Sequence, residues 1–334
     1  MRSYYSVITA VLIALVACSS NESDAPGVME PTATPFDTTT HSTTITSGSV
    51  ILNTPPSPVY TPTIAYGDQP NQFGRLRTPG LLPPDAMPAH DAFPIVVLIH
   101  GGFWRDSFDL ELMAPLATDL SSRGYATWNL EYRGVGSSGG GWPETANDIA
   151  AGIDHLAEIA DEHGLDLDKV IVIGHSAGGQ LALWSAARDH LPEGAPGRDP
   201  IVQPAAVVSL AGVNDLESAD QADLGAGAVA MFLGRDVDRT ALYPESSPAA
   251  LLPLGIPVLL VHGDEDSNVP ISQTSNYATR AREAGDIVEE LTVLGGDHFV
   301  VIDPSSGAWA DVIERLPLLL APGSTQTPGG LSRP

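Results

Sequence analysis

The chain is poor in cysteine and in positive charge. Its 334 residues include one cysteine, Cys18, and one lysine, Lys169. A single cysteine cannot form a disulfide within the chain or supply a cysteine-based metal site. Lysine and arginine together number 15 against 41 aspartates and glutamates, so the formal net charge is −26. A surface this acidic repels nucleic acid, and we expect no nucleic-acid partner.

An apolar run long enough to cross a bilayer is also missing at the start of the chain. The run Val7–Val16 is too short for a mature transmembrane helix. It follows Met1-Arg2 and ends in Leu15-Val16-Ala17-Cys18, as is typical of a bacterial secretion signal that closes in a lipobox. We expect residues 1–17 to be a signal peptide. Cys18 would then be the lipidated first residue of an exported cell-envelope lipoprotein, anchored outside the cytoplasmic membrane. The alternative is a plain signal peptide that happens to contain a cysteine.

Serine, threonine and proline dominate residues 18–58, where aromatic residues are few. Such a segment cannot bury enough apolar surface to offset the entropy of ordering, so we expect a disordered tether. We expect one folded domain over residues 59–321 and a disordered tail over residues 322–334.

From residue 59 onward, apolar patterning predicts strands that alternate with helices. Strands are expected at 60–66, 73–77, 95–99, 125–131, 170–173, 205–211, 258–261 and 288–293, and helices at 110–123, 144–163, 179–188, 272–284 and 308–320. This alternation predicts an α/β fold with a mostly parallel central sheet and helices on both faces. Residues 214–253 interrupt it and are expected to form a short insertion that acts as a partial cap.

The stretch Gly174-His175-Ser176-Ala177-Gly178 lies between an expected strand and an expected helix. A serine between glycines at such a turn is typical of a nucleophile elbow. A Cβ at either glycine would clash in a turn this tight, and the turn holds the hydroxyl at the positive end of the next helix. Because serine alone is a weak nucleophile, the elbow predicts a histidine base and an acid that orients it.

A second stretch, Gly136-Ser137-Ser138-Gly139-Gly140, also fits the pattern. Its flanks are a glycine loop and Trp142-Pro143 rather than a strand and a helix. Ser138 is therefore disfavoured as the nucleophile, and Ser176 is preferred.

The acid and the base are expected in that order, each after a later strand. The strand at 258–261 is followed by Asp264 and Asp266, and the strand at 288–293 by Asp297 and His298. We predict a triad of Ser176, Asp266 and His298, with Asp264 open as an alternative acid and Asp297 as a carboxylate that supports its loop. The acidic cluster lacks the spacing of a calcium loop and a partner pair of histidines, so no metal and no cofactor are expected.

Five motifs occur in order along the chain: His100-Gly101-Gly102-Phe103-Trp104, Glu131-Tyr132-Arg133, the Ser176 elbow, Asp266-x-x-Val269-Pro270 and Asp297-His298-Phe299. By these motifs residues 59–320 resemble the α/β-hydrolase superfamily, closest in pattern to its esterase and kynurenine-formamidase-like branch. Each motif alone is a weak signal, but the combination is specific for this superfamily. The resemblance implies that the acid is Asp266. It also implies an oxyanion hole made by the N–H of Ala177 and that of Gly102 or Phe103.

Several aromatic residues and histidines have less specific roles. Trp104 and Trp142 lie beside motif loops, where they either line an acyl or aryl pocket or serve as ordinary packing. His100 and His175 are expected to make structural hydrogen bonds. His262 is expected to pack in the core or to support the site without touching the substrate.

These expectations point to a serine hydrolase that cleaves a carboxylic ester of a small to medium acyl group. An amide hydrolase, either a formamidase or a peptidase, would use the same triad and remains open. A non-catalytic surface-binding lipoprotein is an alternative from another class, because fold alone never proves activity.

The lipid anchor can be tested on the intact protein from a bacterial host. We expect the mature chain to begin at Cys18 and to carry the added mass of its acyl chains. Mass spectrometry of the N-terminal peptide measures both, with Cys18→Ser as the control that loses the lipid. A retained Met1 on the membrane-bound protein would refute the lipoprotein assignment.

Overall fold

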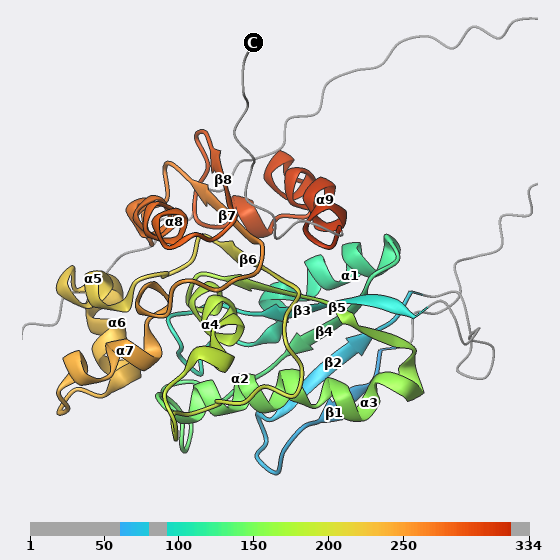
Figure 1. The fold of residues 1–334 in the computed structure, drawn as a ribbon, viewed down its shortest axis with the longest axis horizontal. Helices are drawn as coiled ribbons and strands as arrows, with labels where there is room; N and C mark the ends of the chain where they lie inside the picture. The colour runs from blue at the N-terminus through green and yellow to red at the C-terminus, as the bar shows by residue number, and fades with distance from the viewer. Residues whose placement is uncertain (1–60, 80–91, 322–334) are drawn as a thin grey trace, which may run out of the picture. The chain divides into compact units, whose positions relative to one another are not determined.

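The computed structural model describes residues 61–79 and 92–321. The expected signal peptide, tether and tail, with Cys18, lie outside these residues. The described residues contain one eight-stranded sheet in the order β1-β2-β4-β3-β5-β6-β7-β8 (Figure 1). Its strands are β1 (Thr63–Ala65), β2 (Phe73–Arg77), β3 (Phe93–Ile99), β4 (Ala126–Leu130), β5 (Leu165–His175), β6 (Ala206–Leu210), β7 (Val258–Gly263) and β8 (Val288–Val293). The pairs β1–β2 and β2–β4 are antiparallel, and all other neighbouring pairs are parallel.

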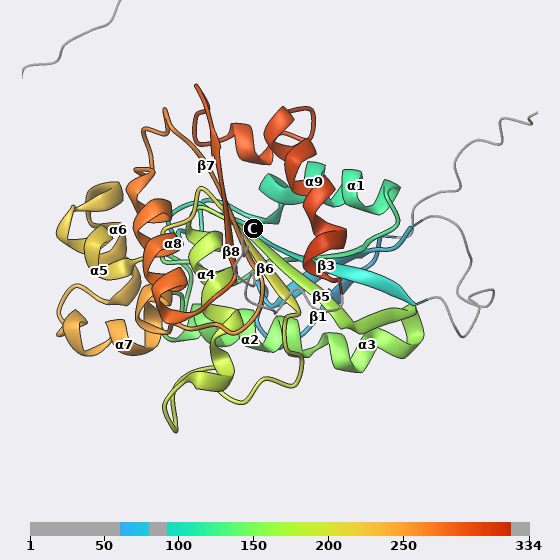
Figure 2. The same cartoon turned by 45° about the horizontal axis from the view of Figure 1, so that its top comes forward.

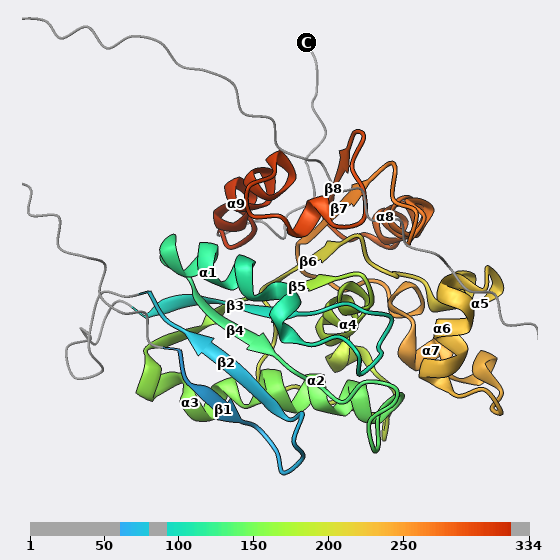
Figure 3. The same cartoon turned by 180° about the vertical axis from the view of Figure 1, so that it is seen from behind.

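Helices cover both faces of the sheet, as Figures 1 and 2 show from two directions. Helices α1 (Ala114–Ser122) and α9 (Gly307–Leu319) lie on one face. Helices α2 (Glu144–Asp154), α3 (Leu156–His163), α4 (Ala177–Ala186) and α8 (Ser272–Ala284) lie on the other. The view from behind shows α1 and α9 together on their side of the strands (Figure 3). Each face holds its own apolar core, and the predicted fold class is confirmed.

Two expected helices differ in detail. The expected helix over 110–123 begins as a 3₁₀ turn, Leu110–Met113, and becomes α1 only at Ala114. Pro115 accounts for this start, because a proline has no N–H to donate and suits the first turn of an α-helix. The single helix expected over 144–163 is two helices that meet at His155, where the backbone stays in the helical region (φ −60°, ψ −21°).

The insertion between β6 and β7 is built of short helices that rest on α4. They are α5 (Leu216–Gln221), α6 (Leu224–Leu233) and α7 (Tyr243–Ser246). Gln180 of α4 donates to the Ser246 carbonyl at 2.9 Å, and the Trp184 indole donates to the Glu245 carbonyl at 2.9 Å. These bonds join the insertion to the helix that follows the elbow, and its role as a partial cap stays a prediction.

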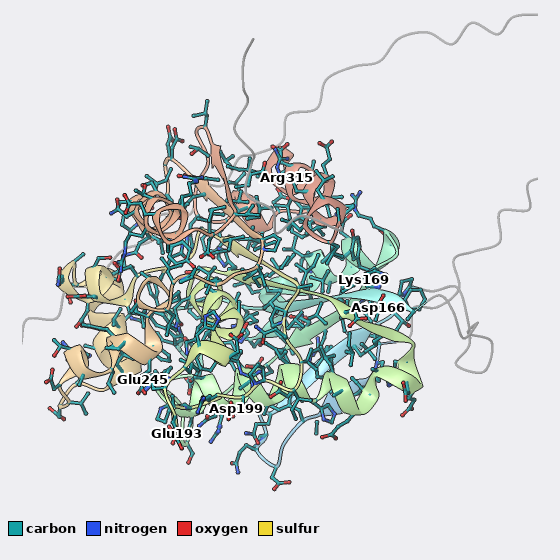
Figure 4. The ribbon with its side chains drawn as sticks, viewed as in Figure 1. Asp166, Lys169, Glu193, Asp199, Glu245 and Arg315 are labelled. Carbon is teal, nitrogen blue, oxygen red and sulfur yellow. The ribbon has the colours of Figure 1, made fainter. Side chains whose placement is uncertain are left out.

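The single lysine of the chain is paired locally. Lys169 donates to Asp166 at 2.7 Å early in β5, and the two side chains lie together in Figure 4. Figure 4 also labels Glu193, Asp199 and Glu245, three of the carboxylates that make the chain acidic. No helix within residues 61–79 and 92–321 combines the length and apolar character needed to cross a bilayer.

The tightest packing occurs where β5 enters the elbow. A Cβ added at Gly174 would overlap the Gly178 carbonyl, and one added at Gly178 would overlap the carbonyls of Ile99 and His100. Backbone atoms surround both positions and cannot swing aside as a side chain could. Both sites therefore require glycine.

This crowding predicts a stability cost for Gly178→Ala. We expect the free energy of unfolding in urea to fall by about 1–3 kcal/mol, because the new methyl group forces strand β3 away from α4. Gly307→Ala is the matched control, since a Cβ there meets nothing within 4 Å, and it should leave stability at or slightly above that of the parent chain. Equal stability of the two variants would contradict the proposed crowding.

Candidate active site

The motif residues gather at the carboxyl edge of the parallel strands. β3 ends at Ile99, before the His100–Trp104 loop, and β5 ends at His175, before Ser176. Asp266 follows β7 and His298 follows β8. Because neighbouring parallel strands end at the same edge, segments far apart in sequence meet there.

Ser176 occupies a strained turn between β5 and α4. Its backbone has φ 56° and ψ −120°, a left-handed value of φ that is uncommon outside glycine. Its N–H donates to the Leu210 carbonyl at 2.9 Å, and the N–H of Gly179 donates to its carbonyl at 2.9 Å. These bonds hold the strained turn on β6 and at the start of α4.

His298 is paired with Asp266. The Nδ1 of His298 lies 2.6 Å from Asp266 Oδ2. The other carboxylate oxygen accepts the backbone N–H groups of Asn268 at 2.8 Å and Val269 at 2.9 Å. Burial by itself would raise the pKa of Asp266, but hydrogen bonds from His262, His298 and the Val269 N–H outweigh it and hold that pKa well below its usual range. Asp266 is therefore a fixed anion.

The neighbouring carboxylates have other partners. Asp264 accepts the N–H of Gly295 at 2.6 Å, which joins the loops after β7 and β8. Asp297 accepts the N–H groups of Phe299 at 3.0 Å and Val300 at 2.9 Å, within its own turn. Of the two acids that the sequence leaves open, Asp266 is the one bonded to His298.

His175 brings the His298 loop against the elbow. Its Nε2 lies 3.0 Å from the His298 carbonyl, and the two ring centroids are 4.6 Å apart. Burial, with a smaller contribution from the neighbouring His298, lowers the pKa of His175 to about 3. The neutral ring can then donate from Nε2 to the carbonyl. Since His175 directly precedes Ser176, this bond joins the nucleophile candidate to the base candidate through one residue.

The loop after β3 carries three left-handed residues in a row. Gly102, Phe103 and Trp104 have φ values of 108°, 52° and 56°. The Arg105 N–H donates to the Gly102 carbonyl at 3.1 Å and closes the turn. Within the described chain, no atom accepts a hydrogen bond from the N–H of Gly102 or Phe103. Ala177 is the first residue of α4, where a backbone N–H has no partner within the helix.

This loop runs directly beside the nucleophile candidate. A Cβ added at Gly101 would lie 2.9 Å from the Cβ of Ser176 and 2.8 Å from the His175 carbonyl. A glycine at 101 is thus what lets the loop approach the elbow. The loop that carries Gly102 and Phe103 therefore passes close to Ser176, which Ala177 directly follows.

Trp104 and Trp142 have well-defined packing partners. Trp104 has no exposed surface, and its indole N–H donates to the Gln180 side-chain oxygen at 2.9 Å. Its ring stacks on Phe232 with the ring centroids 4.6 Å apart. Trp142 meets Trp184 edge to face, with the centroids 6.0 Å apart. These contacts explain both residues as packing between the loops, α4 and α6, and a role as pocket walls stays a prediction.

Two other expectations concern Ser138 and a metal site. Ser138 lies in an exposed turn between β4 and α2, with no helix directly after it.

Among residues 61–79 and 92–321, no group of three or more His, Cys, Asp or Glu side chains is arranged to hold a metal ion.

One neighbour of the acid could not be assigned by motif. The imidazole Nε2 of His262 lies 3.1 Å from Asp266 Oδ2. The sequence offers one signal for it, because His262 ends a buried strand four residues before the acid. That position is also consistent with ordinary packing, and the contact forms because the loop after β7 folds back on the strand.

Comparison with known proteins agrees with this architecture. A family model described as BD-FAE matches residues 84–280. The esterase LipQ of Mycobacterium tuberculosis is 28% identical over 222 residues, which are 64% of this chain and 52% of LipQ. LipC, an esterase of the same organism, is 27% identical over 232 residues, 66% of this chain and 54% of LipC. The probable isoprenylcysteine alpha-carbonyl methylesterase ICME of Oryza sativa is 26% identical over 265 residues, 75% of this chain and 61% of ICME. The chain spans about half the length of LipQ and LipC.

Solved structures share the fold. Esterase B from Lactobacillus rhamnosis superposes with a TM-score of 0.66 at 22% identity, over 79% of this chain and 86% of that protein. An esterase of Thermogutta terrifontis with butyrate bound gives a TM-score of 0.61 at 20% identity, over 81% of this chain and 96% of that protein. At these identities the likeness establishes the α/β fold.

The depressed pKa of Asp266 predicts how its contribution to stability varies with pH. The folded protein keeps Asp266 ionised at pH values where the unfolded chain binds a proton. Its stabilising contribution is therefore complete above about pH 4 and is lost as the pH falls toward the folded-state pKa. We expect Asp266→Asn to be less stable than the parent chain near neutral pH, by a difference that narrows below about pH 4. Urea unfolding across this pH range measures the difference, and a constant difference would contradict the assignment.

Proposed function

The chain belongs to the BD-FAE family, and from this premise we propose that it is a serine carboxylesterase with Ser176, His298 and Asp266 as its triad. The observation that carries the proposal is the 2.6 Å bond between His298 and Asp266, beside an elbow that holds Ser176 in a strained turn. The names of the relatives favour ester hydrolysis, since LipQ and LipC are called esterases.

Attack on the substrate follows from these residues. The Ser176 hydroxyl adds to the acyl carbonyl carbon while its proton passes to Nε2 of His298. Asp266 holds the opposite ring nitrogen and stabilises the imidazolium that forms. The anionic state of Asp266, supported by its hydrogen-bond donors, supplies the charge that this step needs.

The negative charge that develops on the carbonyl oxygen needs preorganised donors. The N–H of Ala177 and that of Gly102 or Phe103 would supply them, each worth about 3–4 kcal/mol of transition-state stabilisation. The imidazolium then protonates the leaving alcohol, and the bond between the acyl carbon and that alcohol breaks. A water molecule, deprotonated by His298, releases the acid from the acyl-enzyme. No step of this cycle requires a cofactor.

We propose a small to medium acyl group for the substrate. The insertion between β6 and β7 supports this size, because its short helices are bonded down on α4 rather than raised as a large lid. An amide substrate, cleaved as by a formamidase or a peptidase, would use the same residues. It is the alternative that a substrate panel decides.

We propose that the enzyme is exported and held at the cell envelope by a lipid on Cys18. The support is the sequence alone: a short apolar run after Met1-Arg2, the Leu15-Val16-Ala17-Cys18 segment, and a polar stretch after it. A tether of about 40 residues would then reach roughly 35 Å when fully flexible and place the domain clear of the lipid surface.

Ester hydrolysis is tested with p-nitrophenyl esters of increasing acyl length, beside N-formyl and peptide amides. We expect activity on short esters and a loss of about 10³-fold or more in Ser176→Ala, because the nucleophile is gone. Ser138→Ala is the matched control and should keep parent activity. A fluorophosphonate probe should label Ser176 and no other residue.

A second pair of variants separates the two candidate acids. Asp266→Asn should reduce kcat by at least about 100-fold, since the imidazole then lacks its anion. Asp264→Asn should stay within about threefold, because it accepts only a backbone N–H. In the substrate panel, faster turnover of the amides than of the esters would overturn the ester assignment. A folded protein that the fluorophosphonate probe does not label would favour the non-catalytic alternative.

A further inference from the structure

We propose that His262 is a positioning residue of this site, a buried imidazole that holds Asp266, and through it His298, in the orientation needed for proton transfer. The inference rests on the proposed function for the role of His298. The direct contacts of His262 come from the loop after β7 and from α8.

His262 is completely buried near the end of β7. Both of its ring nitrogens are occupied by protein atoms. Nε2 lies 2.9 Å from the Val269 carbonyl, and Nδ1 lies 2.7 Å from the Thr274 hydroxyl. The ring has no route to a substrate, so any effect on the reaction must pass through its neighbours.

These contacts identify the proton-bearing nitrogen. Nε2 faces two oxygens that can only accept, the Val269 carbonyl and Asp266 Oδ2 at 3.1 Å. Nε2 must therefore carry a hydrogen, because a bare nitrogen there would repel both oxygens. In the neutral ring Nδ1 is then an acceptor, and Thr274 donates its hydroxyl hydrogen to it.

The same loop segment is held from two directions. The Val269 N–H binds one oxygen of Asp266, while the Val269 carbonyl accepts from His262. His262 therefore fixes the peptide that carries part of the acid's hydrogen-bond shell. It also presents a positive N–H edge to the other oxygen, the one that binds His298. Without His262 that oxygen has His298 as its remaining side-chain partner.

Thr274 connects this arrangement to the elbow. Its hydroxyl oxygen lies 3.5 Å from the Asn214 amide nitrogen, and the Asn214 amide oxygen accepts from Ser209 at 2.8 Å. All three side chains are buried. The Ser209 hydroxyl lies 2.7 Å from where a Cβ on Gly179 would stand, so the polar chain ends against α4. A chain of buried polar contacts thus runs from Ser209, which packs beside α4, through Asn214, Thr274 and His262 to the acid.

The charged and titratable groups around His262 come from three segments. Asp266 lies on its own loop, His298 comes from the loop after β8, and His175 comes from the end of β5. Burial keeps the pKa of His175 low, at about 3, so that ring stays uncharged. The one anion in contact with His262 is Asp266, among the residues that the structure describes.

The test compares His262→Leu with His262→Gln. A glutamine amide can place an N–H near the position of Nε2, whereas leucine fills the space without a donor. We expect His262→Leu to lower kcat/KM for a short p-nitrophenyl ester by about 10- to 100-fold, mostly in kcat. His262→Gln should recover most of that loss. Thermal unfolding of each variant monitors the fold.

The pH profile separates positioning from loss of structure. With one donor removed, the Asp266 carboxylate attracts the proton on His298 more strongly. The acidic limb of kcat/KM should therefore move to higher pH in His262→Leu and return toward the parent position in His262→Gln. A purely structural role would lower the whole profile without moving the limb.

Thr274→Val tests the network at its next member. It removes the hydroxyl that donates to His262 while keeping the shape of the side chain. We expect a smaller loss than in His262→Leu, and no further loss when the two substitutions are combined, because both act through one contact. Additive losses in the double variant would show that Thr274 acts independently of His262.

One measurement does not depend on turnover. The Nδ1–H proton of His298, bonded to Asp266, should give a low-field proton resonance that Asp266→Asn abolishes. We expect it to shift in His262→Leu and to be largely restored in His262→Gln. If the parent chain lacks esterase activity but this resonance responds as described, the proposed function fails and the positioning role stands. If His262→Leu keeps activity within about twofold and the resonance is unmoved, the positioning role is overturned.

Discussion

The candidate site depends on one close crossing of backbone, where β5 turns through Ser176 into α4. The turn is possible because Gly174 and Gly178 leave room for carbonyl groups that a Cβ would strike. That contact presses α4 against β3 and aims its first, unpaired N–H at the same edge of the sheet. The Ser176 backbone is strained at φ 56°, and the surrounding hydrogen bonds to β6 and α4 maintain it.

Around this turn the buried histidines divide between two tasks. His298 contacts the Asp266 carboxylate through Nδ1, and it is the histidine proposed to exchange a proton. His175 directs Nε2 toward a carbonyl, and His262 directs its two nitrogens toward a carbonyl, a hydroxyl and the acid. Burial lowers the pKa of His175 to about 3, so that ring can donate from one nitrogen without bringing a charge into the core. The acid between them is kept ionised by its donors despite burial.

Local patterns predicted most of the elements well. Continuous apolar runs marked β3 and β7, and the helix over Ser272–Ala284 and the strand over Val288–Val293 have the bounds that the sequence indicates. The order of motifs along the chain also indicated which carboxylate and which histidine would meet. Tertiary context governed the rest. The division of one expected helix into two at His155 and the 3₁₀ turn before Ala114 were not indicated by local periodicity.

By itself the amino-acid sequence determined the fold class, the elbow serine and the candidate partners, because glycine spacing, apolar runs and motif order are local properties of the chain. The tertiary structure adds the contacts that distinguish Asp264 from Asp266, since Asp264 accepts a backbone N–H of the loop after β8 whereas Asp266 contacts the His298 ring. It likewise shows which atoms His262 contacts, a residue that the sequence left between core packing and support of the site. The physical reason is the same in both cases: a hydrogen bond requires two atoms within about 3 Å, and neighbours from β7, β8 and α8 are brought that close only when the sheet assembles.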